Sequence, residues 1–232
     1  MRLLKERLYR DQIDGTAYFR ATLVAAARGA QVVLDLGCGA GNVRTDVRGD
    51  VEIVIGCDLD AAVGRNATVH HRVKADGYRL PFGDGTFDLV SMDFVIEHLA
   101  DPIAFFREVR RVLRLGGRLV FRTPNRLHYV AIIASATPHW FHELVANRSR
   151  GLAASGGVWP TYYRANTTRR ITAALEAAGL GAIKLEMIER EPSYLAFAAP
   201  AFALGILYER VVNSTERLAR FRSNIFGVAV KI

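Results

Sequence analysis

The chain has 232 residues, of which half are hydrophobic and 23% are charged, and these values are ordinary for one globular domain. Its formal net charge of +8 suits an anionic partner such as nucleic acid, a lipid surface or an acidic substrate, and identifies none of them. The two cysteines form no disulfide framework or metal-binding spacing, the first residues lack the apolar core of a signal peptide, and no apolar run has the roughly 20 residues of a membrane-spanning helix. We therefore expect a cytoplasmic protein without a metal ion.

Strands and helices are predicted to alternate along the chain. Short apolar runs that end in turn residues predict strands at 32–37, 51–60, 85–93 and 118–124. A strand, a crossover helix and a second strand of these lengths imply parallel pairing. The expected fold is therefore α/β, with a doubly wound and mainly parallel sheet.

The crossover helix is predicted at 101–117. Asp101 can cap it, Pro102 suits its first turn, and Gly116 and Gly117 are expected to end it. One face is apolar and is expected to be buried; it holds Phe105, Val109, Val112 and Leu113.

A second helix is predicted at 167–180, with Ile171 and Leu175 turned inward and Gly179 as its stop. Two more strands are predicted near the C-terminus, at 182–189 and 226–232.

Three glycines follow the first strand at alternate positions, Gly37, Gly39 and Gly41. Glycine suits a backbone that turns with positive φ or that a ligand approaches closely. A dinucleotide fold would want glycine or alanine where Asn42 stands, and the preceding Asp35 would face a pyrophosphate unfavourably. An acid beside a bare turn, with no phosphate-binding lysine, favours a cationic nucleoside over NAD or ATP. S-adenosylmethionine (SAM) carries an ammonium and a sulfonium and has no phosphate.

Two further acids follow strand ends. Asp58 ends the second predicted strand, about twenty residues after the glycines, where a carboxylate can accept hydrogen bonds from both ribose hydroxyls. Asp76 follows a third short apolar and basic run, where it could accept from an adenine amino group. The alternative for Asp58 alone is a capping residue.

The segments "VLDLGCGAG", "GCDLD", "ADGYRLPFGDGTFDLVSMDFVIEHLADP" and "REVRRVLRLGGRLVFRTPN" resemble the successive motifs of class I SAM-dependent methyltransferases. More narrowly, the chain resembles their small-molecule branch, which includes quinone-type O-methyltransferases. The resemblance covers roughly 32–125 and implies a seven-stranded sheet whose last strand is antiparallel. The cofactor-binding residues that it implies are Asp35, Gly37, Cys38, Gly39 and Gly41 for the methionine part, Asp58 and Leu59 for the ribose, Asp76 and Gly77 for the adenine edge, and Met92 and Asp93 after the fourth strand.

The dipeptide Glu97–His98 has two interpretations. His98 could be a general base, because histidine titrates near neutral pH. The favoured interpretation is a structural histidine that bonds the backbone where a strand meets a helix. Methyl transfer from a sulfonium can rely on proximity and alignment, with a base needed only where the acceptor must lose a proton.

A segment at 126–165 is too long for a plain connection and is rich in histidine and aromatic residues. His128, His139 and His142 allow a zinc site as one interpretation, but no cysteine or nearby acid completes it. A lid over an apolar or aromatic acceptor is favoured. His128 is the predicted catalytic base, because it lies nearest in sequence to the strand end where the methyl group should sit, and His139 is the second choice.

A second unshared segment lies at about 192–222, with an apolar run from Leu195 to Leu207. A helix is expected beyond Pro200. Its apolar stripe is Leu204, Leu207, Tyr208, Val211 and Leu218, and Arg210, Arg217 and Arg220 lie off the stripe. One interpretation, the favoured one, is a helix packed on the sheet. The other is a basic amphipathic helix on an anionic membrane surface, or an apolar wall for a lipid-linked acceptor.

The predicted function is transfer of a methyl group from SAM to a small-molecule or lipid-linked acceptor by one domain spanning 1–232. A hydroxyl is the expected acceptor, with N- or C-methylation left open. A nucleic-acid methyltransferase would suit the charge, but "SMDFVIEH" stands where base-methylating enzymes often carry an Asn-Pro-Pro-Tyr-like clamp. A non-catalytic SAM-binding subunit is the other alternative, and the intact set of acids argues against it.

Overall fold

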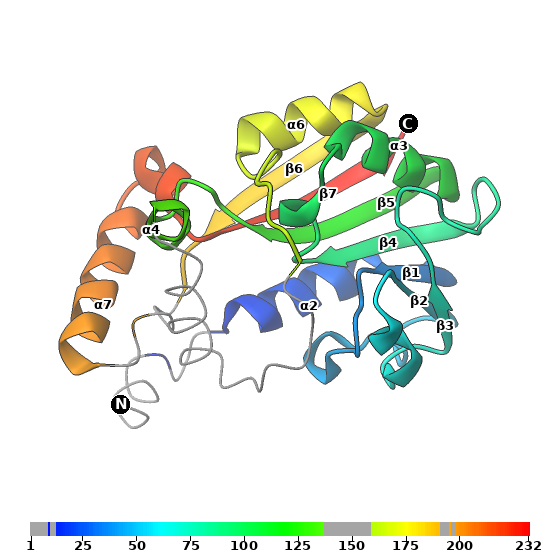
Figure 1. Cartoon of the computed structure of the whole chain (residues 1–232), viewed down its shortest axis with the longest axis horizontal. Coiled ribbons are helices and arrows are strands. Elements are labelled where there is room, and N and C mark those ends of the chain that lie inside the picture. Colours follow the sequence, from blue (N-terminus) through cyan, green and yellow to red (C-terminus); the bar gives the residue numbers. More distant parts are fainter. Residues whose placement is uncertain (1–8, 10–12, 137–158, 191–194, 196–197) are drawn as a thin grey trace.

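The computed structural model describes residues 9, 13–136, 159–190, 195 and 198–232. Its centre is a seven-stranded sheet with the order β3-β2-β1-β4-β5-β7-β6 (Figure 1). The strands are β1 (Val32–Leu36), β2 (Ile53–Asp58), β3 (His71–Lys74), β4 (Phe87–Asp93), β5 (Leu113–Pro124), β6 (Leu180–Ile188) and β7 (Asn224–Lys231). The pairs among β1 to β5 are parallel, and β7 is antiparallel to both of its neighbours. The predicted doubly wound sheet and its antiparallel last strand are confirmed.

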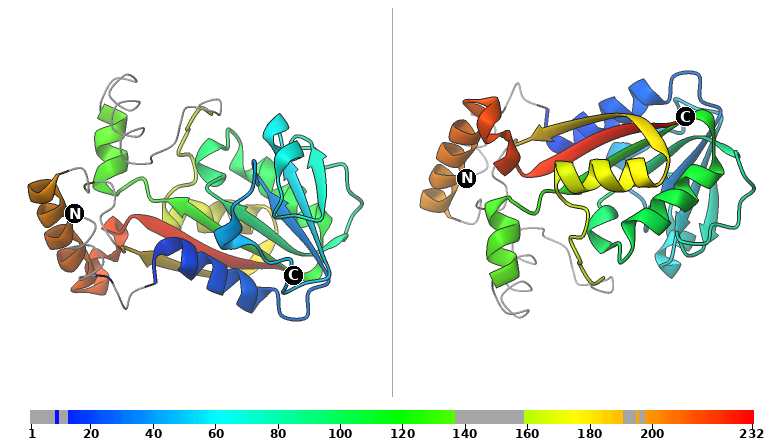
Figure 2. Two further views of the ribbon diagram at one scale, coloured as in Figure 1. Left: turned by 90° about the horizontal axis from the view of Figure 1, so that it is seen from below. Right: turned by 90° about the horizontal axis from the view of Figure 1, so that it is seen from above.

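Helices cover both faces of this sheet (Figure 2). The helices are α2 (Gly15–Ala26), α3 (Pro102–Val112), α4 (Tyr129–Ala136), α6 (Thr168–Ala177) and α7 (Ala199–Asn213). One core forms where α2 packs Phe19 and Leu23 on Val33. The other forms on the opposite face, where α3 and α6 pack on side chains such as Leu34. Because neighbouring residues of a strand point to opposite faces, Val33 and Leu34 reach different cores.

The predicted end of α3 is wrong. Asp101 caps the helix by accepting from the Ala104 amide (3.1 Å) and Pro102 lies in its first turn, as expected. The helix ends at Val112, however, because Leu113 already pairs with Phe87 of β4. Gly116 and Gly117 lie within β5, where the pairing register shifts. Gly117 serves packing there, since a Cβ atom would lie 2.8 Å from the Arg114 carbonyl oxygen.

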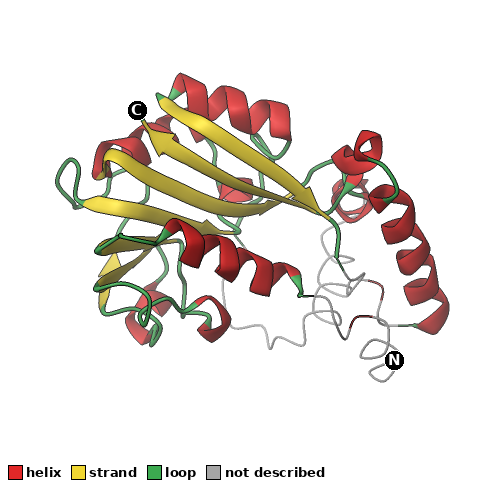
Figure 3. Ribbon diagram, turned by 180° about the vertical axis from the view of Figure 1, so that it is seen from behind, coloured by secondary structure: helices red, strands yellow, loops and turns green. Residues whose placement is uncertain are grey.

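The favoured interpretation of the second unshared segment is also wrong. α7 lies beyond the end of the sheet and not on its face (Figures 1 and 3). Its buried residues are Phe202, Gly205, Glu209 and Val212, whereas Leu204, Leu207 and Val211 of the predicted stripe are exposed. No helix among the described residues is long and apolar enough to cross a bilayer.

Candidate active site

The three glycines after β1 all have positive φ: 76° at Gly37, 49° at Gly39 and 93° at Gly41. A side chain at Gly37 would lie 2.4 Å from Cγ2 of Val95, and one at Gly41 would lie 2.4 Å from Oδ1 of Asn66. Nothing lies within 4 Å of the Cβ position at Gly39. The first and third glycines therefore allow close packing, and the middle one leaves the turn open to solvent or to a ligand.

The amide groups of these glycines bond within the protein. Gly37 N–H donates to the Cys57 carbonyl (2.7 Å), Gly39 N–H to Oδ2 of Asp58 (2.7 Å) and Gly41 N–H to the Cys38 carbonyl (3.0 Å). A phosphate-binding turn works in the opposite way, because it aims free amides at the anion. This turn is therefore built for a ligand that does not need these three donors.

A cavity of about 150 Å³ opens beside the turn. This volume is enough for part of a nucleoside-sized ligand. Two of its walls were not predicted, namely Phe19 and Leu23 of α2 and the segment after the glycines. A signal for α2 was present, because Asp14 precedes it as an N-cap and Phe19 and Leu23 are spaced by one helical turn. The lining residues are Phe19, Leu23, Asp35, Gly37, Cys38, Ala40, Gly41, Asn42, Thr45 and Asp93.

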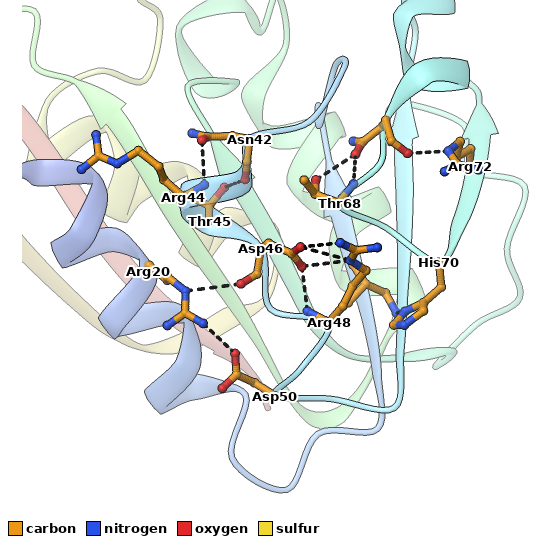
Figure 4. A network of polar contacts seen from close by, with 12 residues as sticks. Arg20, Asn42, Arg44, Thr45, Asp46, Arg48, Asp50, Thr68, His70 and Arg72 are labelled. Carbon is orange, nitrogen blue, oxygen red and sulfur yellow. Dashed lines mark hydrogen bonds and ion pairs between the residues drawn. The ribbon is translucent and has the colours of Figure 1, made fainter.

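The segment after the glycine turn is tied to α2 by polar contacts (Figure 4). Arg20 of α2 donates to the Asp46 carbonyl (3.3 Å) and to the Asp50 carboxylate (3.1 Å). Within the segment, the Asp46 carboxylate accepts from the Arg48 guanidinium and from the Arg48 amide. These contacts hold Asn42 and Thr45 in place as one wall of the cavity.

Asp35 brings a carboxylate to the cavity from near the end of β1. Oγ of the buried Ser91, on the adjacent strand β4, donates to Oδ1 of Asp35 (2.9 Å). Burial raises the pKa of Asp35 to about 6 despite this hydrogen bond, and the negative charges of Asp93 and Asp58 add to the rise. A positive ligand group in the cavity would offset the same cost. Asp35 therefore fits an ammonium or sulfonium and opposes a phosphate.

Asp58 braces the glycine turn. Its Oδ2 accepts from the Gly39 amide and its Oδ1 accepts from the Asp60 amide, both at 2.7 Å. The capping role considered for this residue belongs to Asp60 instead, whose side chain accepts from the Ala62 amide as the N-cap of the next helical turn. Each carboxylate oxygen of Asp58 can accept more than one hydrogen bond, so both remain able to receive a ribose hydroxyl. Asp58 does not line the cavity itself.

The remaining predicted contacts for the nucleoside follow neighbouring strands and lie outside the cavity lining. Leu59 is exposed directly after β2. Asp76 is exposed after β3, and its Oδ1 accepts from the Tyr78 amide (2.9 Å). At Gly77 a Cβ atom would lie 2.5 Å from the Phe105 ring, so glycine is required there for packing. Their roles toward adenosine stay predictions.

Cys38 lines the cavity, whereas the Met92 side chain does not. Burial and the charge of Asp35 raise the pKa of the Cys38 thiol to about 12, so this cavity wall stays neutral. The Met92 side chain is fully buried in the core on the side of α3 and α6. Any contact between Met92 and a cofactor would therefore use its backbone.

Asp93 lines the cavity but is already paired. Both of its oxygens accept from Arg122 at 2.6 Å, and this arginine is 5% exposed. The guanidinium also lies over the ring of Phe94, 4.5 Å from its centroid, and 5.2 Å from that of Phe19. Because Arg122 neutralises Asp93, Asp35 is the more suitable of the two carboxylates for a positive ligand.

Phe94 has an unusual backbone for an aromatic residue, with φ at 60° directly after β4. Such a conformation costs free energy and persists only where surrounding contacts hold it. Here the Phe94 amide donates to the Arg122 carbonyl (2.9 Å), and the ring stacks on the guanidinium. These contacts present a partly exposed ring beside Asp93.

The described ends of the segment 126–165 meet at one place. The Arg126 amide donates to the Asn166 carbonyl (2.9 Å), and the Tyr162 amide donates to the Glu97 carbonyl (2.8 Å). Nδ1 of His98 lies 2.9 Å from the Pro160 carbonyl oxygen. The structural interpretation of His98 is thereby confirmed. Residues 137–158 of the predicted lid lie outside the described residues.

The structure does not bring His128 to the cavity. This residue is 3% exposed, and its Nε2 lies 3.3 Å from Oε2 of Glu189. Its ring packs against those of Tyr129 and Tyr208, with distances between ring centroids of 4.2 and 5.5 Å. This placement does not support a catalytic base at His128. His139 lies outside the described residues and stays a prediction.

Among the described residues no group of three histidine, cysteine or acidic side chains could hold a metal ion. Two of the three histidines considered for zinc, at 139 and 142, lie outside the described residues.

Known proteins resemble this chain in sequence and in fold. Residues 34–121 match the family model described as a methyltransferase domain. The chain is 40% identical over 115 residues to a demethylmenaquinone methyltransferase of Beutenbergia cavernae, covering 45% of this chain and 47% of the relative. It is 33% identical over 159 residues to one of Mycolicibacterium vanbaalenii, covering 63% and 67%. The chain belongs to the class I SAM-dependent methyltransferases.

The matches to this methyltransferase family are partial, since the chain spans about half the length of the first curated relatives it matches. Solved structures are similar in fold. A putative methyltransferase from Bacillus halodurans superposes with a TM-score of 0.55 at 20% identity, covering 94% of this chain and 98% of that one. A phosphoethanolamine N-methyltransferase 2 from Haemonchus contortus, solved with S-adenosyl-L-methionine, gives 0.54 at 18% identity, covering 98% and 59%.

The residues of this methyltransferase chain fit SAM. Asp35 is a half-buried carboxylate whose raised pKa a cation would lower, and it faces the cavity. The glycine amides are already bonded, as suits a ligand without phosphate. Asp58 keeps acceptor capacity beside the open turn at Gly39.

Proposed function

We propose that this chain transfers the methyl group of SAM to a small-molecule acceptor. The observation that carries the proposal is Asp35, a carboxylate that lines the cavity beside the glycine turn with its pKa raised to about 6. When bound, SAM would supply a methyl group activated by a positively charged sulfur. The family and the curated relatives support the same conclusion.

Each residue has a separate task in this proposal. Asp35, oriented by Ser91, binds the positive methionine part. Asp58 holds the turn open through Gly39 and accepts from the ribose, while Asp76 and Gly77 lie toward the adenine. Arg122 keeps Asp93 neutralised and fixes the ring of Phe94 at the acceptor side. Positioning by these groups can supply most of the catalysis.

The acceptor we propose is a quinone-type ring. The relatives named for demethylmenaquinone favour this class, and the exposed ring of Phe94 offers an aromatic surface to it. A hydroxyl on the ring is the predicted methylation site, and a ring carbon is the alternative. His139 is the predicted base for a hydroxyl. We place the enzyme in the cytoplasm with peripheral contact at a membrane surface, and the two free cysteines support this compartment.

Calorimetry tests the cofactor part. SAM and S-adenosylhomocysteine should bind, whereas NAD and ATP should not. Asp35→Asn should weaken SAM binding at least tenfold, because it removes a charged partner from a buried site. Asp84→Asn is the matched control, since this carboxylate is 81% exposed and pairs with Arg111. Equal affinity in Asp35→Asn and the parent protein would contradict the assignment.

Mass spectrometry tests the transfer. The protein is incubated with SAM carrying a deuterated methyl group and with reduced quinones that have a free ring hydroxyl or a free ring carbon. A product with the labelled mass shift supports methyl transfer, and fragmentation locates the methyl on oxygen or carbon. Tight SAM binding with no labelled product from quinones or from cell extract would contradict an enzymatic role.

A further inference from the structure

Helix α7 packs on the protein with one side and exposes large aliphatic side chains on the opposite side. Phe202, Gly205, Glu209 and Val212 face the protein and are buried. On the opposite side Leu204, Leu207 and Val211 are 66%, 59% and 49% exposed. Their spacing of three and four residues places them on one line along the helix. We call these three side chains the outer stripe.

An outer stripe of this kind needs a partner. A surface helix normally carries polar residues on the side away from the core, and a helix that is apolar all round is found in apolar surroundings. Large exposed aliphatic side chains in a row are typical of an interaction site. The neighbouring helix α4 lies against α7 through Tyr129 and Tyr208, whose ring centroids are 4.7 Å apart, and it exposes Ile132 as well.

Arg210 lies on α7 next to Val211 of the outer stripe, and Arg217 and Arg220 lie in the short helical turn that follows α7. Arg210, Arg217 and Arg220 are exposed, and no carboxylate among the described residues pairs with their side chains. The two acids within residues 199–222 are already engaged. Glu209 points inward and accepts from Tyr9, and Glu216 pairs with Arg222 at 2.9 Å. Arg220 lies over the Phe221 ring, 4.8 Å from its centroid, so the region combines an apolar line with positive charge that no described carboxylate pairs.

We propose that the outer stripe of α7 docks on an anionic lipid bilayer, with the three arginines at the level of the headgroups. An amphipathic helix with aliphatic side chains on one side and arginines at its border binds such surfaces. A second copy of the chain is a poorer partner, because a self-complementary contact through this stripe would bring the arginines of both copies together.

The docking surface and the cavity both lie toward the carboxyl ends of the parallel strands. The Asn125 side chain, directly after β5, donates to the Arg220 and Arg222 carbonyls at 2.8 and 2.7 Å. This anchors the segment after α7 to the carboxyl end of β5, and the glycine turn follows the carboxyl end of the parallel strand β1. A docked protein would thus take its acceptor from the lipid phase. That consequence rests on the proposed function, whereas the docking itself does not.

Vesicle flotation tests the docking without SAM or acceptor. The full chain is mixed with vesicles of phosphatidylcholine and phosphatidylglycerol in equal amounts, or of phosphatidylcholine alone. We expect the protein to float with the anionic vesicles at low salt, to float much less as salt rises, and to stay at the bottom with neutral vesicles.

Two pairs of variants locate the contact. Leu204→Ser with Leu207→Ser should weaken flotation at least tenfold, whereas Leu115→Ser, at a leucine that is 78% exposed far from α7, should not. Arg210→Glu with Arg217→Glu should abolish flotation, whereas the same charge change at the exposed Arg107 and Arg169 of α3 and α6 should reduce it less.

Three results would overturn the proposal. The parent protein could stay at the bottom of the anionic gradient at low salt. The α7 variants could float as well as their matched controls. Sedimentation could show a dimer that Leu204→Ser with Leu207→Ser dissociates, with no vesicle binding, which would assign the stripe to a second copy. SAM binding measured on the same variants should be unchanged, so loss of docking and loss of the proposed function give different results.

Discussion

At the scale of single residues, the cavity depends on a carboxyl group placed where its charge is costly. Asp35 is partly withdrawn from water and lies near two other acids, and burial is the main cause of its raised pKa. In the unfolded chain the same group ionises near 3.8. The folded protein therefore holds a proton on Asp35 over a range of pH in which the unfolded chain releases it.

This difference predicts how stability depends on pH. Between about pH 4 and pH 6 the folded state binds more protons than the unfolded state, so this group lowers the free energy of unfolding as pH rises. Asp35→Asn removes the effect. We expect the variant without ligand to gain stability over the parent protein at pH 7, and to lose that gain toward pH 4. Urea denaturation at the two pH values measures it, and a difference that is the same at both would contradict the prediction.

The glycine turn gives a graded prediction. Gly41→Ala should destabilise the fold by about 2–4 kcal/mol, because an alanine at positive φ costs about 1–2 kcal/mol and its Cβ would overlap Asn66 and Thr68. Gly39→Ala meets no neighbour and should cost about 1–2 kcal/mol. Gly64→Ala is the control, with neither a positive φ nor a neighbour, and should stay within about 0.5 kcal/mol. Equal losses in all three, measured by denaturation, would exclude this explanation.

A site residue can be predicted from the sequence when its position is set by neighbouring residues in the chain. Asp35 and Asp58 were predictable, because acids at the ends of adjacent parallel strands come together. Arg122 and Phe94 were not. The ion pair of Arg122 with Asp93 follows from the register between β4 and β5, and the positive φ of Phe94 follows from contacts with that arginine. Neither is encoded in a local pattern.

At the scale of helices and strands, α7 carries both a buried and an exposed apolar side chain, whose contributions to stability can be compared. Phe202→Ala should cost about 3–5 kcal/mol of the free energy of unfolding, because the ring is fully buried and its removal leaves a cavity. Leu207→Ser lies on the outer stripe and should change the same quantity by less than about 0.5 kcal/mol. Thermal or urea denaturation of both variants is the measurement. A large loss in Leu207→Ser would mean that the outer stripe is covered by the protein itself.

The elements that the sequence predicted least well are those with two possible partners. The apolar residues of α7 fit either of two faces, and periodicity cannot say which one the core will take. The sequence predicted that α3 ends at Gly116, but the helix ends earlier because Leu113 pairs with Phe87 of β4. That pairing joins residues far apart in the sequence, so a local pattern does not reveal it. The strands themselves were predictable, since each apolar run has one length and one pair of turn signals.

At the scale of the whole molecule, the proposed site lies at one end of the strands, and the opposite end carries only structural contacts in this proposal. The glycine turn and Asp58 lie at the carboxyl ends of β1 and β2, and residues 113–117, the first part of β5, lie at the opposite end of the β4–β5 pair. Ligands in open α/β sheets bind at the carboxyl ends.

Hydrogen exchange should report this division. Addition of SAM should slow amide exchange in 37–41 and 58–62 and leave 113–118 unchanged, because only the first two segments belong to the proposed SAM site. Peptide-level mass spectrometry with and without SAM makes the comparison, and NAD serves as the ligand control. Protection of 113–118 equal to that of 37–41 would contradict the placement of the SAM site at the carboxyl ends of the strands.

The hydrogen bond between the Arg126 amide and the Asn166 carbonyl has an evolutionary consequence. It fastens both ends of the intervening segment to one spot on the scaffold, so the chain between them can lengthen or shorten at a small cost in loop-closure entropy. Related proteins could therefore differ in the segment between Arg126 and Asn166 while the sheet, the glycine turn and Asp35 stay unchanged. If the segment binds the acceptor, as predicted from the sequence, the choice of acceptor would then change independently of the proposed SAM site.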